Sequence, residues 1–539
     1  MRITLGISGP AGGGVFTAGT LVCEILADLG YFVIGDKEYS SVIKGGNNLF
    51  TISISYNGYY FSKQIDYFMY FNDYALDNNQ ENYSIKNSIK IEKNLCNYQN
   101  AYAIGLIGKL LGIEKQIIID KIKTQYKADS IEKNVHDIEN AYNSSIDNIF
   151  QTTPKDKKSL YFGNEILAKG ALASGLHFYG AYPMTPASSI IEVIIKDKNV
   201  VFYQGEDEIA VAMAMLGAKF AGKRSMCGSS GGGFALMSES ISFANQAEIG
   251  GVYILSQRAG PSTGTPTFTE QSDINYGLNA SFGETYPIVI YPSSFEDGFN
   301  LIGKALNWSD IYQHPVIVLT EKVYSESYVS VSENDLIPQE IDRGKLIKNP
   351  SQDFARYQFS DNGISPYTVP GTPNGEFIAS SYEHNEYGAS VENSQNKIRM
   401  TDKRLKKLDT LIENEFNESF FGYEIINGAA SNIYITVGFN SYGVKSFIQD
   451  KPQYGLIIIK ILSPFDKRLK KFLEENENNI QNLIFVEQNA TGQLQDLVLS
   501  KLDLTSNNWN QKIKSIRKYD LYPVYQEDLL IKEKKGEQI

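Results

Sequence analysis

Short apolar runs alternate with helical patterns through the middle of the chain. Each run is only three to five residues long, and helical patterns lie between most of them. The runs are Val200–Tyr203, Ser225–Cys227, Val252–Ser256, Pro287–Ile290 and Val316–Thr320. Because strands that alternate with helices pair mostly in parallel, this pattern predicts a mainly parallel, doubly wound sheet.

One helical pattern in this region carries small apolar side chains on almost every face. It lies within residues 205–222, begins with the acidic triplet Glu206–Glu208 and ends before Gly222. A helix without a polar face is predicted to be buried on all sides. The triplet by itself fits a cap that complements the helix dipole. Glu208, at the edge of the core, then needs a bonding partner, because a bare buried carboxylate is costly.

The first 150 residues predict a separate α/β domain. The apolar run Ile3–Ile7 leads into the glycine turn Gly9–Gly14, a helical pattern from Val15 and a second run, Tyr31–Ile34. That order is a βαβ unit. The turn could accept a phosphate on its backbone N–H groups. It lacks the Lys-Ser/Thr ending of a P-loop, so as a motif it is not one.

Three further stretches follow this domain. Residues 158–345 hold the middle α/β pattern, and residues 426–539 hold another. Between them, residues 346–425 lose their periodicity, since Pro, Gly, Ser, Asn and Tyr dominate until a helical pattern returns at Lys403–Glu415. A stretch of this kind predicts a crossing arm or a linker. The strands predicted in the last stretch are Ile433–Thr436, Leu456–Ile459 and Leu483–Val486.

The composition of the 539 residues excludes several function classes. There are 62 acidic and 50 basic residues, a net charge of −12, which argues against a nucleic-acid partner. The three cysteines form no C-x-x-C pair, so we expect neither a zinc site nor an iron–sulfur cluster in this chain. No apolar run is long enough to cross a bilayer, and we expect a cytoplasmic protein without a membrane partner.

Candidate chemistry lies in four loops of the middle domain. They are Tyr182–Ser189, Glu206–Glu208, Gly228–Gly233 and Gln257–Thr267. Loops at the carboxyl ends of strands in a doubly wound sheet are where ligands bind. Arg258 could hold a carboxylate with two parallel hydrogen bonds. The alternatives are ordinary ones: a serine cap on the next helix for the first loop, and a surface salt bridge for Arg258.

Taken together, these loops resemble one family. The middle domain resembles the pyrimidine-binding domain in the alpha subunit of thiamine-diphosphate-dependent 2-oxoacid:ferredoxin oxidoreductases. The segments that carry the resemblance are Tyr182–Ser189, Glu206–Gly222, Ser229–Met237, Gln257–Thr267 and Glu270–Asp273. The resemblance implies an α/β, multidomain fold whose middle domain is of the transketolase pyrimidine type.

The resemblance extends to both ends of the chain. The C-terminal stretch is similar to the transketolase C-terminal-like domain of that subunit, and the N-terminal stretch to the family's gamma domain, here fused in front. The C-terminal segments are Val437–Phe439, Leu462–Phe465 and Val486–Asn489. The N-terminal ones are Gly12–Gly19 and Ile43–Gly46.

The family's roles can be carried over residue by residue. Glu208 matches the glutamate that bonds the aminopyrimidine ring of thiamine diphosphate. Thr185 and Arg258 match residues that hold the carboxylate and carbonyl oxygen of the substrate, and Ser188 joins that substrate-binding set. The gamma domain is associated with coenzyme A, a co-substrate. The residues that could contact it are Gly12, Gly13 and Gly14.

Half of the expected site is missing from the chain. Thiamine enzymes mark their magnesium-diphosphate site with Gly-Asp-Gly, and no such motif occurs here. The resemblance therefore implies a beta subunit that supplies Mg²⁺ binding and a [4Fe–4S] cluster, passes electrons to ferredoxin and forms an αβ or (αβ)2 complex. The favoured reaction is oxidative decarboxylation of a 2-oxoacid, 2-oxoglutarate first among them. The alternative is a non-catalytic nucleotide-binding or assembly module.

Overall fold

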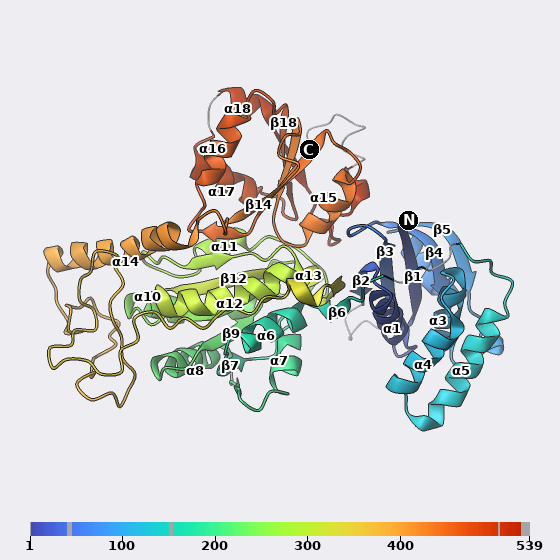
Figure 1. Ribbon diagram of the computed structural model, residues 1–539, viewed down its shortest axis with the longest axis horizontal. Helices are drawn as coiled ribbons and strands as arrows, with labels where there is room; N and C mark the ends of the chain where they lie inside the picture. Colours follow the sequence, from blue (N-terminus) through green and yellow to red (C-terminus); the bar gives the residue numbers. More distant parts are fainter. Residues whose placement is uncertain (1, 40–45, 150–152, 154, 505–506, 530–539) are drawn as a thin grey trace.

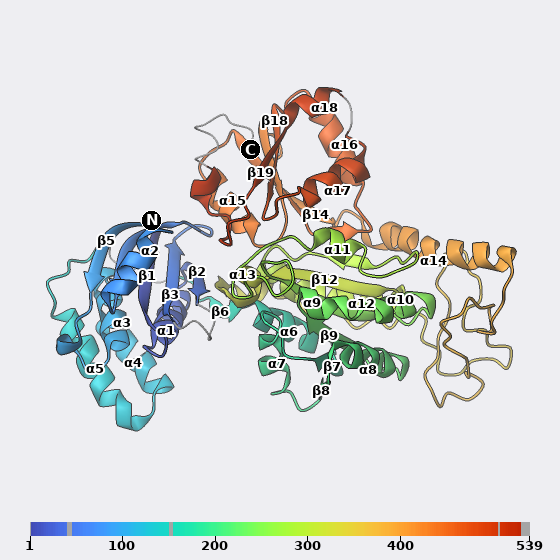
Figure 2. The ribbon, with the colours of Figure 1, turned by 180° about the vertical axis from the view of Figure 1, so that it is seen from behind.

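Three sheets, each in a different part of the molecule, organise the chain (Figure 1). The computed structural model describes residues 2–39, 46–149, 153, 155–504 and 507–529. The N-terminal and C-terminal parts both lie against the middle part, and a long arm extends from its far end (Figure 2).

The middle sheet is parallel along six of its seven strands. Its order is β17-β11-β12-β10-β9-β7-β8, and each neighbouring pair from β11 to β8 is parallel. The prediction of a mainly parallel sheet is therefore confirmed. The strands are β7 (Phe178–Ala181), β8 (Val201–Gln204), β9 (Ser225–Ser229), β10 (Gly251–Gln257), β11 (Ile288–Ile290), β12 (Pro315–Glu321) and β17 (Ile461–Ser463).

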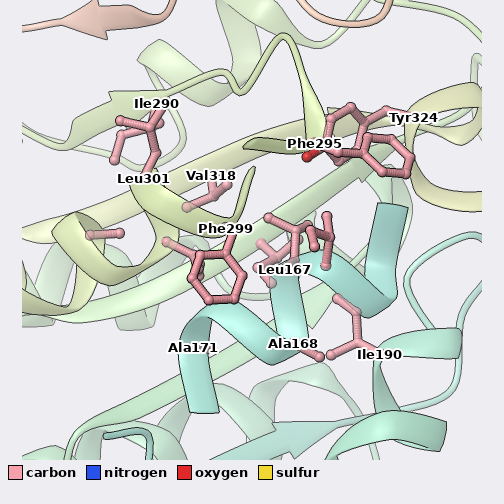
Figure 3. Packing of buried hydrophobic residues seen from close by; sticks show 14 of the residues in the cluster. Leu167, Ala168, Ala171, Ile190, Ile290, Phe295, Phe299, Leu301, Val318 and Tyr324 are labelled. Carbon is pink, nitrogen blue, oxygen red and sulfur yellow. The ribbon is translucent and has the colours of Figure 1, made fainter. Parts of the chain in front are cut away.

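Helices cover both faces of this sheet, so its central strands are buried on both sides. Side chains of β10 alternate between two cores: Val252 and Ile254 face one, Tyr253 and Leu255 the other. Burial on both faces explains why the strands are near-continuous apolar runs. One face carries α6 (Gly163–Ala173), α7 (Ser189–Ile194) and α12 (Phe295–Ile311), packed as Figure 3 shows. The other carries α8 (Glu208–Phe220), α9 (Gly231–Ala235), α10 (Ser238–Gln246) and α11 (Ile274–Leu278).

Helix α8 is not buried on all sides, and that prediction is wrong for this chain. Ile209 is 49% exposed and Met213 is 45% exposed, one turn apart on the same face of the helix. Val201, on the edge strand β8, is 62% exposed. The other faces of α8 pack on β7, β9 and α10. The apolar composition thus predicts a helix whose whole surface is buried, but the rest of this chain buries only part of that surface.

The N-terminal sheet is mixed, in the order β5-β4-β1-β3-β2-β13-β6. The predicted βαβ unit is present, but β3 lies between its two strands and is antiparallel to both. The last two strands come from either end of the middle stretch of the chain. Its strands are β1 (Arg2–Pro10), β2 (Phe32–Glu38), β3 (Asn47–Ser55), β4 (Gln64–Tyr70), β5 (Ser84–Lys90), β6 (Ser159–Phe162) and β13 (Tyr328–Val331).

Five helices accompany this sheet. Helix α1 packs on β2 and β3, and α3 packs on α5. They are α1 (Val15–Asp28), α2 (Asp73–Gln80), α3 (Gln99–Leu110), α4 (Lys115–Gln125) and α5 (Ala128–Tyr142).

The C-terminal sheet has five strands in the order β14-β16-β15-β18-β19, all parallel except β14. It confirms the three strands predicted there. The strands are β14 (Tyr423–Ile426), β15 (Asn432–Thr436), β16 (Tyr454–Ile459), β18 (Asn482–Glu487) and β19 (Ile513–Arg517). The helices beside it are α15 (Asn440–Ile448), α16 (Arg468–Glu475), α17 (Gln493–Leu502) and α18 (Asn507–Lys512).

The arm consists of residues 336–393, without a helix or strand, followed by α14 (Ser394–Glu415). It is fixed to the body by a buried ion cluster. Lys403 Nζ lies 2.7 Å from Glu248 Oε1, and Lys407 bonds the other oxygen of the same carboxylate. Burial alone would raise the pKa of Glu248, but these two lysines hold it well below its ordinary value. Burial lowers the pKa of Lys407 to about 7.

Candidate functional site

The candidate residues lie at one edge of the middle sheet. Thr185 follows β7, Glu208 follows β8, Ser229 ends β9 and Arg258 follows β10. These four strands are neighbours and parallel, so their carboxyl ends point to the same edge. That edge is where doubly wound sheets bind their ligands.

Glu208 is the first residue of α8, and its side chain is buried. Asp207 caps the helix, since its carboxylate accepts a hydrogen bond from Ala210 N at 2.8 Å. Glu208 is only 3% exposed, and its Oε1 accepts a hydrogen bond from Ser229 Oγ at 3.0 Å. Among the described residues, Ser229 is the one hydrogen-bond donor to this carboxylate. Oε2 of Glu208 is thus left to accept a hydrogen bond from a ligand or from another chain.

Gly233 gives the Glu208 carboxylate its room. A Cβ at Gly233 would lie 2.1 Å from Glu208 Oε1 and 2.3 Å from Ser229 Oγ, far inside contact distance. The neighbouring Gly232 differs, because a Cβ there meets nothing within 4 Å. One glycine of the predicted glycine-rich loop is therefore required by packing against the carboxylate, and the next is not.

Arg258 and Thr185 are brought together by a backbone contact. Arg258 Nη1 donates a hydrogen bond to the carbonyl oxygen of Thr185 at 2.8 Å. The loop that carries Thr185 is held in turn by Asn164, whose amide donates to Pro186 O at 2.7 Å and to Ser189 Oγ at 2.8 Å. Burial lowers the pKa of Arg258, although its guanidinium keeps donors for a further partner.

Ser188 stands at the N-cap position of α7, as the ordinary interpretation predicts, but its side chain makes no capping hydrogen bond. Its backbone N–H donates to Met184 O at 3.0 Å. No hydrogen bond within the described residues links the Ser188 side chain to Arg258 or Glu208. Met184 itself connects two of the loops, because Ser229 Oγ lies 3.7 Å from its sulfur.

Asp273 is an acidic residue of the site to which the sequence assigned no role. Burial, and then the nearby Glu270, raise its pKa to about 6, while Arg258 lowers it. Its Oδ2 would lie 3.5 Å from a Cβ at Gly231. Segment Glu270–Asp273 was recognisable in the sequence, but the contacts of Ser229, Gly233 and Asp273 join positions far apart along the chain. No local sequence pattern predicts these contacts.

The predicted coenzyme A residues lie in the N-terminal domain, at the start of α1. Gly12 and Gly14 have positive φ values of 82° and 75°, whereas Gly13 does not. A Cβ at Gly14 would lie 2.5 Å from Asn100 Nδ2. No hydrogen bond between described residues joins this turn to the loops of the middle domain. Most of the segment Ile43–Gly46 lies outside the described residues.

Two kinds of feature are absent from the described ranges. Within them, no helix is both long and apolar enough to cross a membrane. In the same ranges, no three His, Cys, Asp or Glu side chains gather as a metal site would require.

Known proteins that resemble this chain are of one kind. Residues 169–403 match the thiamine-diphosphate-binding family of pyruvate flavodoxin/ferredoxin oxidoreductases, and residues 4–94 match the pyruvate ferredoxin/flavodoxin oxidoreductase family. A 2-oxoacid:ferredoxin oxidoreductase subunit alpha from Sulfolobus is 28% identical, over 95% of this chain and 94% of its own length. The 2-oxoglutarate synthase subunit KorA of Methanothermobacter marburgensis is 32% identical, over 47% of this chain and 68% of its own.

A solved structure has the same fold over the whole chain. The 2-oxoglutarate:ferredoxin oxidoreductase from Magnetococcus marinus, solved with 2-oxoglutarate, coenzyme A and succinyl-CoA bound, matches with a TM-score of 0.88. The match covers 99% of both chains at 24% identity. The arrangement of the three sheets and the arm is thus shared with that protein.

Proposed function

Because the chain belongs to the alpha-subunit family of 2-oxoacid:ferredoxin oxidoreductases, we propose that its site binds thiamine diphosphate at Glu208 and a 2-oxoacid at Arg258 and Thr185. The family's reaction is oxidative decarboxylation of a 2-oxoacid to its acyl-CoA, with electrons passed to ferredoxin. The match of residues 169–403 to a thiamine-diphosphate-binding family supports the first part of the proposal.

The observation that carries the proposal is the half-satisfied carboxylate of Glu208. One oxygen is hydrogen-bonded to Ser229, and the carboxylate is buried at the ligand edge of the sheet. The other oxygen has no donor among the described residues and can accept a further hydrogen bond. An N–H or protonated ring nitrogen of an aminopyrimidine is such a donor. Thiamine diphosphate supplies, when bound, an electron sink for the bond that breaks in decarboxylation.

Each residue of the chain then has a definite task. Glu208 holds a proton shared with the pyrimidine ring, and Ser229 and Gly233 fix the direction of its carboxylate. Arg258 binds the substrate carboxylate, since a guanidinium offers two parallel donors to such a group. Thr185 holds Arg258 through its carbonyl oxygen, which leaves the threonine hydroxyl for the substrate.

The substrate that we favour is 2-oxoglutarate. The relative from Methanothermobacter marburgensis is named a 2-oxoglutarate synthase subunit, and the structure from Magnetococcus marinus was solved with 2-oxoglutarate bound. Coenzyme A is the proposed acyl acceptor. Its proposed contacts are Gly12, Gly13 and Gly14, where the left-handed Gly14 precedes the N-terminus of α1.

The open face beside Glu208 supports a partner subunit. The exposed side chains of Ile209 and Met213 lie on the helix that Glu208 begins, and Val201 lies on the strand that leads to it. Apolar side chains exposed together mark an interaction surface. We assign this surface to a beta subunit that supplies Mg²⁺, the diphosphate site and a [4Fe–4S] cluster, and that reduces ferredoxin.

Replacing Glu208→Gln in the assembled enzyme tests the proposal. Loss of this acid–base group should lower kcat by about 10²- to 10⁴-fold. Steady-state reduction of ferredoxin with 2-oxoglutarate and coenzyme A measures it. Glu206→Gln is the matched control, because Glu206 is an exposed acid of the same triplet and should leave kcat unchanged. Equal activity of the two variants would refute the role of Glu208.

A further inference from the structure

Asp273 is a carboxylate of the site that neither capping nor ion pairing explains. We propose that Asp273 is a positioning residue that takes up a proton when the carboxylate of a 2-oxoacid binds at Arg258. The inference rests on the proposed role of Arg258 and deepens it. It adds a residue that lets the site hold one more negative charge.

The backbone of Asp273 is fixed to the residue that precedes Arg258. Its N–H donates to Gln257 Oε1 at 2.9 Å, and Gln257 immediately precedes Arg258 in the chain. The side chain of Gln257 is fully buried and donates to the hydroxyl of Tyr291 at 2.9 Å. Asp273 and Arg258 are therefore attached to the same buried anchor.

The side chain of Asp273 faces Gly231, in the glycine turn that also packs against Glu208. Asp273 stands at the N-cap position of α11, a position where aspartate ordinarily caps, yet it makes no capping bond. Its Oδ2 instead faces Gly231, at 3.5 Å from where a Cβ would be. Gly233, two residues on, packs against Glu208. Residues Gly231–Gly233 thus separate the carboxylates of Asp273 and Glu208. Within the described residues, nothing donates a hydrogen bond to the Asp273 carboxylate.

The charges that face Asp273 are unequal. Arg258, at the end of β10, favours its ionised form, and Glu270, in the preceding loop, opposes it. The phenols of Tyr276 and Tyr291 are the other titratable groups that sense it. The carboxylate of Glu270 is itself bonded to Gly260 N at 2.9 Å. Burial and Glu270 together raise the pKa of Asp273 to about 6.

A second carboxylate arriving at Arg258 changes this balance. Asp273 and a carboxylate bound at Arg258 would repel each other, and the weaker acid takes up a proton. Protonating a group with a pKa of about 6 costs only a factor of about ten at pH 7. Substrate affinity should consequently fall by up to about tenfold for each pH unit above that pKa.

Proton uptake on binding is the direct measurement. The assembled enzyme is titrated by calorimetry at pH 7 with oxamate, an unreactive mimic of the 2-oxoacid head, in phosphate and in Tris. The difference between the two buffers should correspond to about 0.5–0.9 proton taken up per site. Asp273→Asn should abolish the uptake and flatten the dependence of affinity on pH. A merely structural role would leave the uptake unchanged.

Glu270→Gln is the second variant, and it keeps Asp273. Because Glu270 raises the pKa of Asp273, the fall in oxamate affinity should begin at lower pH in this variant. If the Asp273→Asn variant does not form the enzyme complex, the pH shift in Glu270→Gln is the test of the inference. Absence of that shift then overturns the inference. Uptake that persists in Asp273→Asn, or that is missing in the unmodified enzyme, also overturns it.

Arg258→Lys separates this inference from the function on which it rests. If Arg258→Lys leaves oxamate affinity unchanged, the proposed substrate contact fails, and the role of Asp273 fails with it. If Arg258→Lys weakens oxamate binding while Asp273→Asn keeps the proton uptake, only the role of Asp273 is refuted.

Discussion

A single missing methyl group sets the position of the Glu208 carboxylate. Gly233→Ala would place a Cβ 2.1 Å from Glu208 Oε1, so either the carboxylate or the start of α9 must move. A displacement of about 1 Å at a catalytic group costs on the order of 10²-fold in rate. We expect kcat of the assembled enzyme to fall by about that factor, as measured by ferredoxin reduction.

Gly232→Ala is the matched control for this change. It adds the same methyl group one residue earlier, where nothing lies within 4 Å, so kcat should stay within twofold, roughly, of the unmodified enzyme. If the two alanine variants lose activity equally, flexibility of the glycine segment matters rather than the room for Glu208.

The positions of site residues were predictable only where a motif marked them. Glu208, Arg258 and Thr185 stand in loops that the sequence marks by glycine, proline and charge. Ser229 and Asp273 acquire their partners through the fold: Ser229 lies 21 positions from Glu208, and Asp273 is anchored to Gln257, 16 positions away. Such contacts depend on the order of the strands in the sheet, and that order cannot be deduced from a single sequence.

At the scale of elements, the N-cap of α8, Asp207, directly precedes Glu208 and holds the start of the helix in place. Asp207→Ala removes the bond from the Asp207 carboxylate to Ala210 N and should destabilise the chain by about 1 kcal/mol. Denaturant unfolding of the chain measures the loss. Glu206→Ala is the control, since Glu206 is exposed and makes no cap, and it should change stability by less than about 0.5 kcal/mol. Equal losses would mean that α8 is held by packing alone.

Elements with a strong hydrophobic period were predictable, and short ones were not. Strands β9 to β12 follow from apolar runs, because strands buried on both faces are rich in apolar residues. Strand β7 was missed, since Phe178–Ala181 is short and contains Gly180. The exposed face of α8 was also missed, because composition says that a surface is apolar and not which chain covers it.

At the scale of the molecule, the three sheets are interlocked. Strand β17 leaves the C-terminal region to pair with β11 of the middle sheet, and β6 and β13 complete the N-terminal sheet. Gln271 adds a polar junction: its amide donates to Glu321 Oε1 at 3.2 Å and accepts from Asn440 at 2.8 Å. The C-terminal region is thereby held over the edge that carries the site.

The arm depends on one buried carboxylate. Glu248→Gln would leave Lys403 and Lys407 buried without their counter-charge, and breaking a buried ion pair in this way costs about 3–5 kcal/mol. We expect lower stability in denaturant and faster protease cleavage within residues 336–393. Glu413→Gln is the control, because Glu413 is exposed and pairs only with Lys406, and it should cost less than about 1 kcal/mol. Unchanged cleavage in Glu248→Gln would show that the cluster does not hold the arm.

The N-terminal sheet also has a consequence for how the protein is made. Strand β2 ends at Glu38, but its neighbour β13 ends at Val331, so 331 − 38 = 293 residues must be synthesised before the pair can form. At roughly 5–20 residues per second, the ribosome needs about 15–60 s to supply them. Throughout that interval the nascent chain carries an open strand edge, the kind of edge that pairs with other chains. Early chaperone contact with the first domain is the expected safeguard.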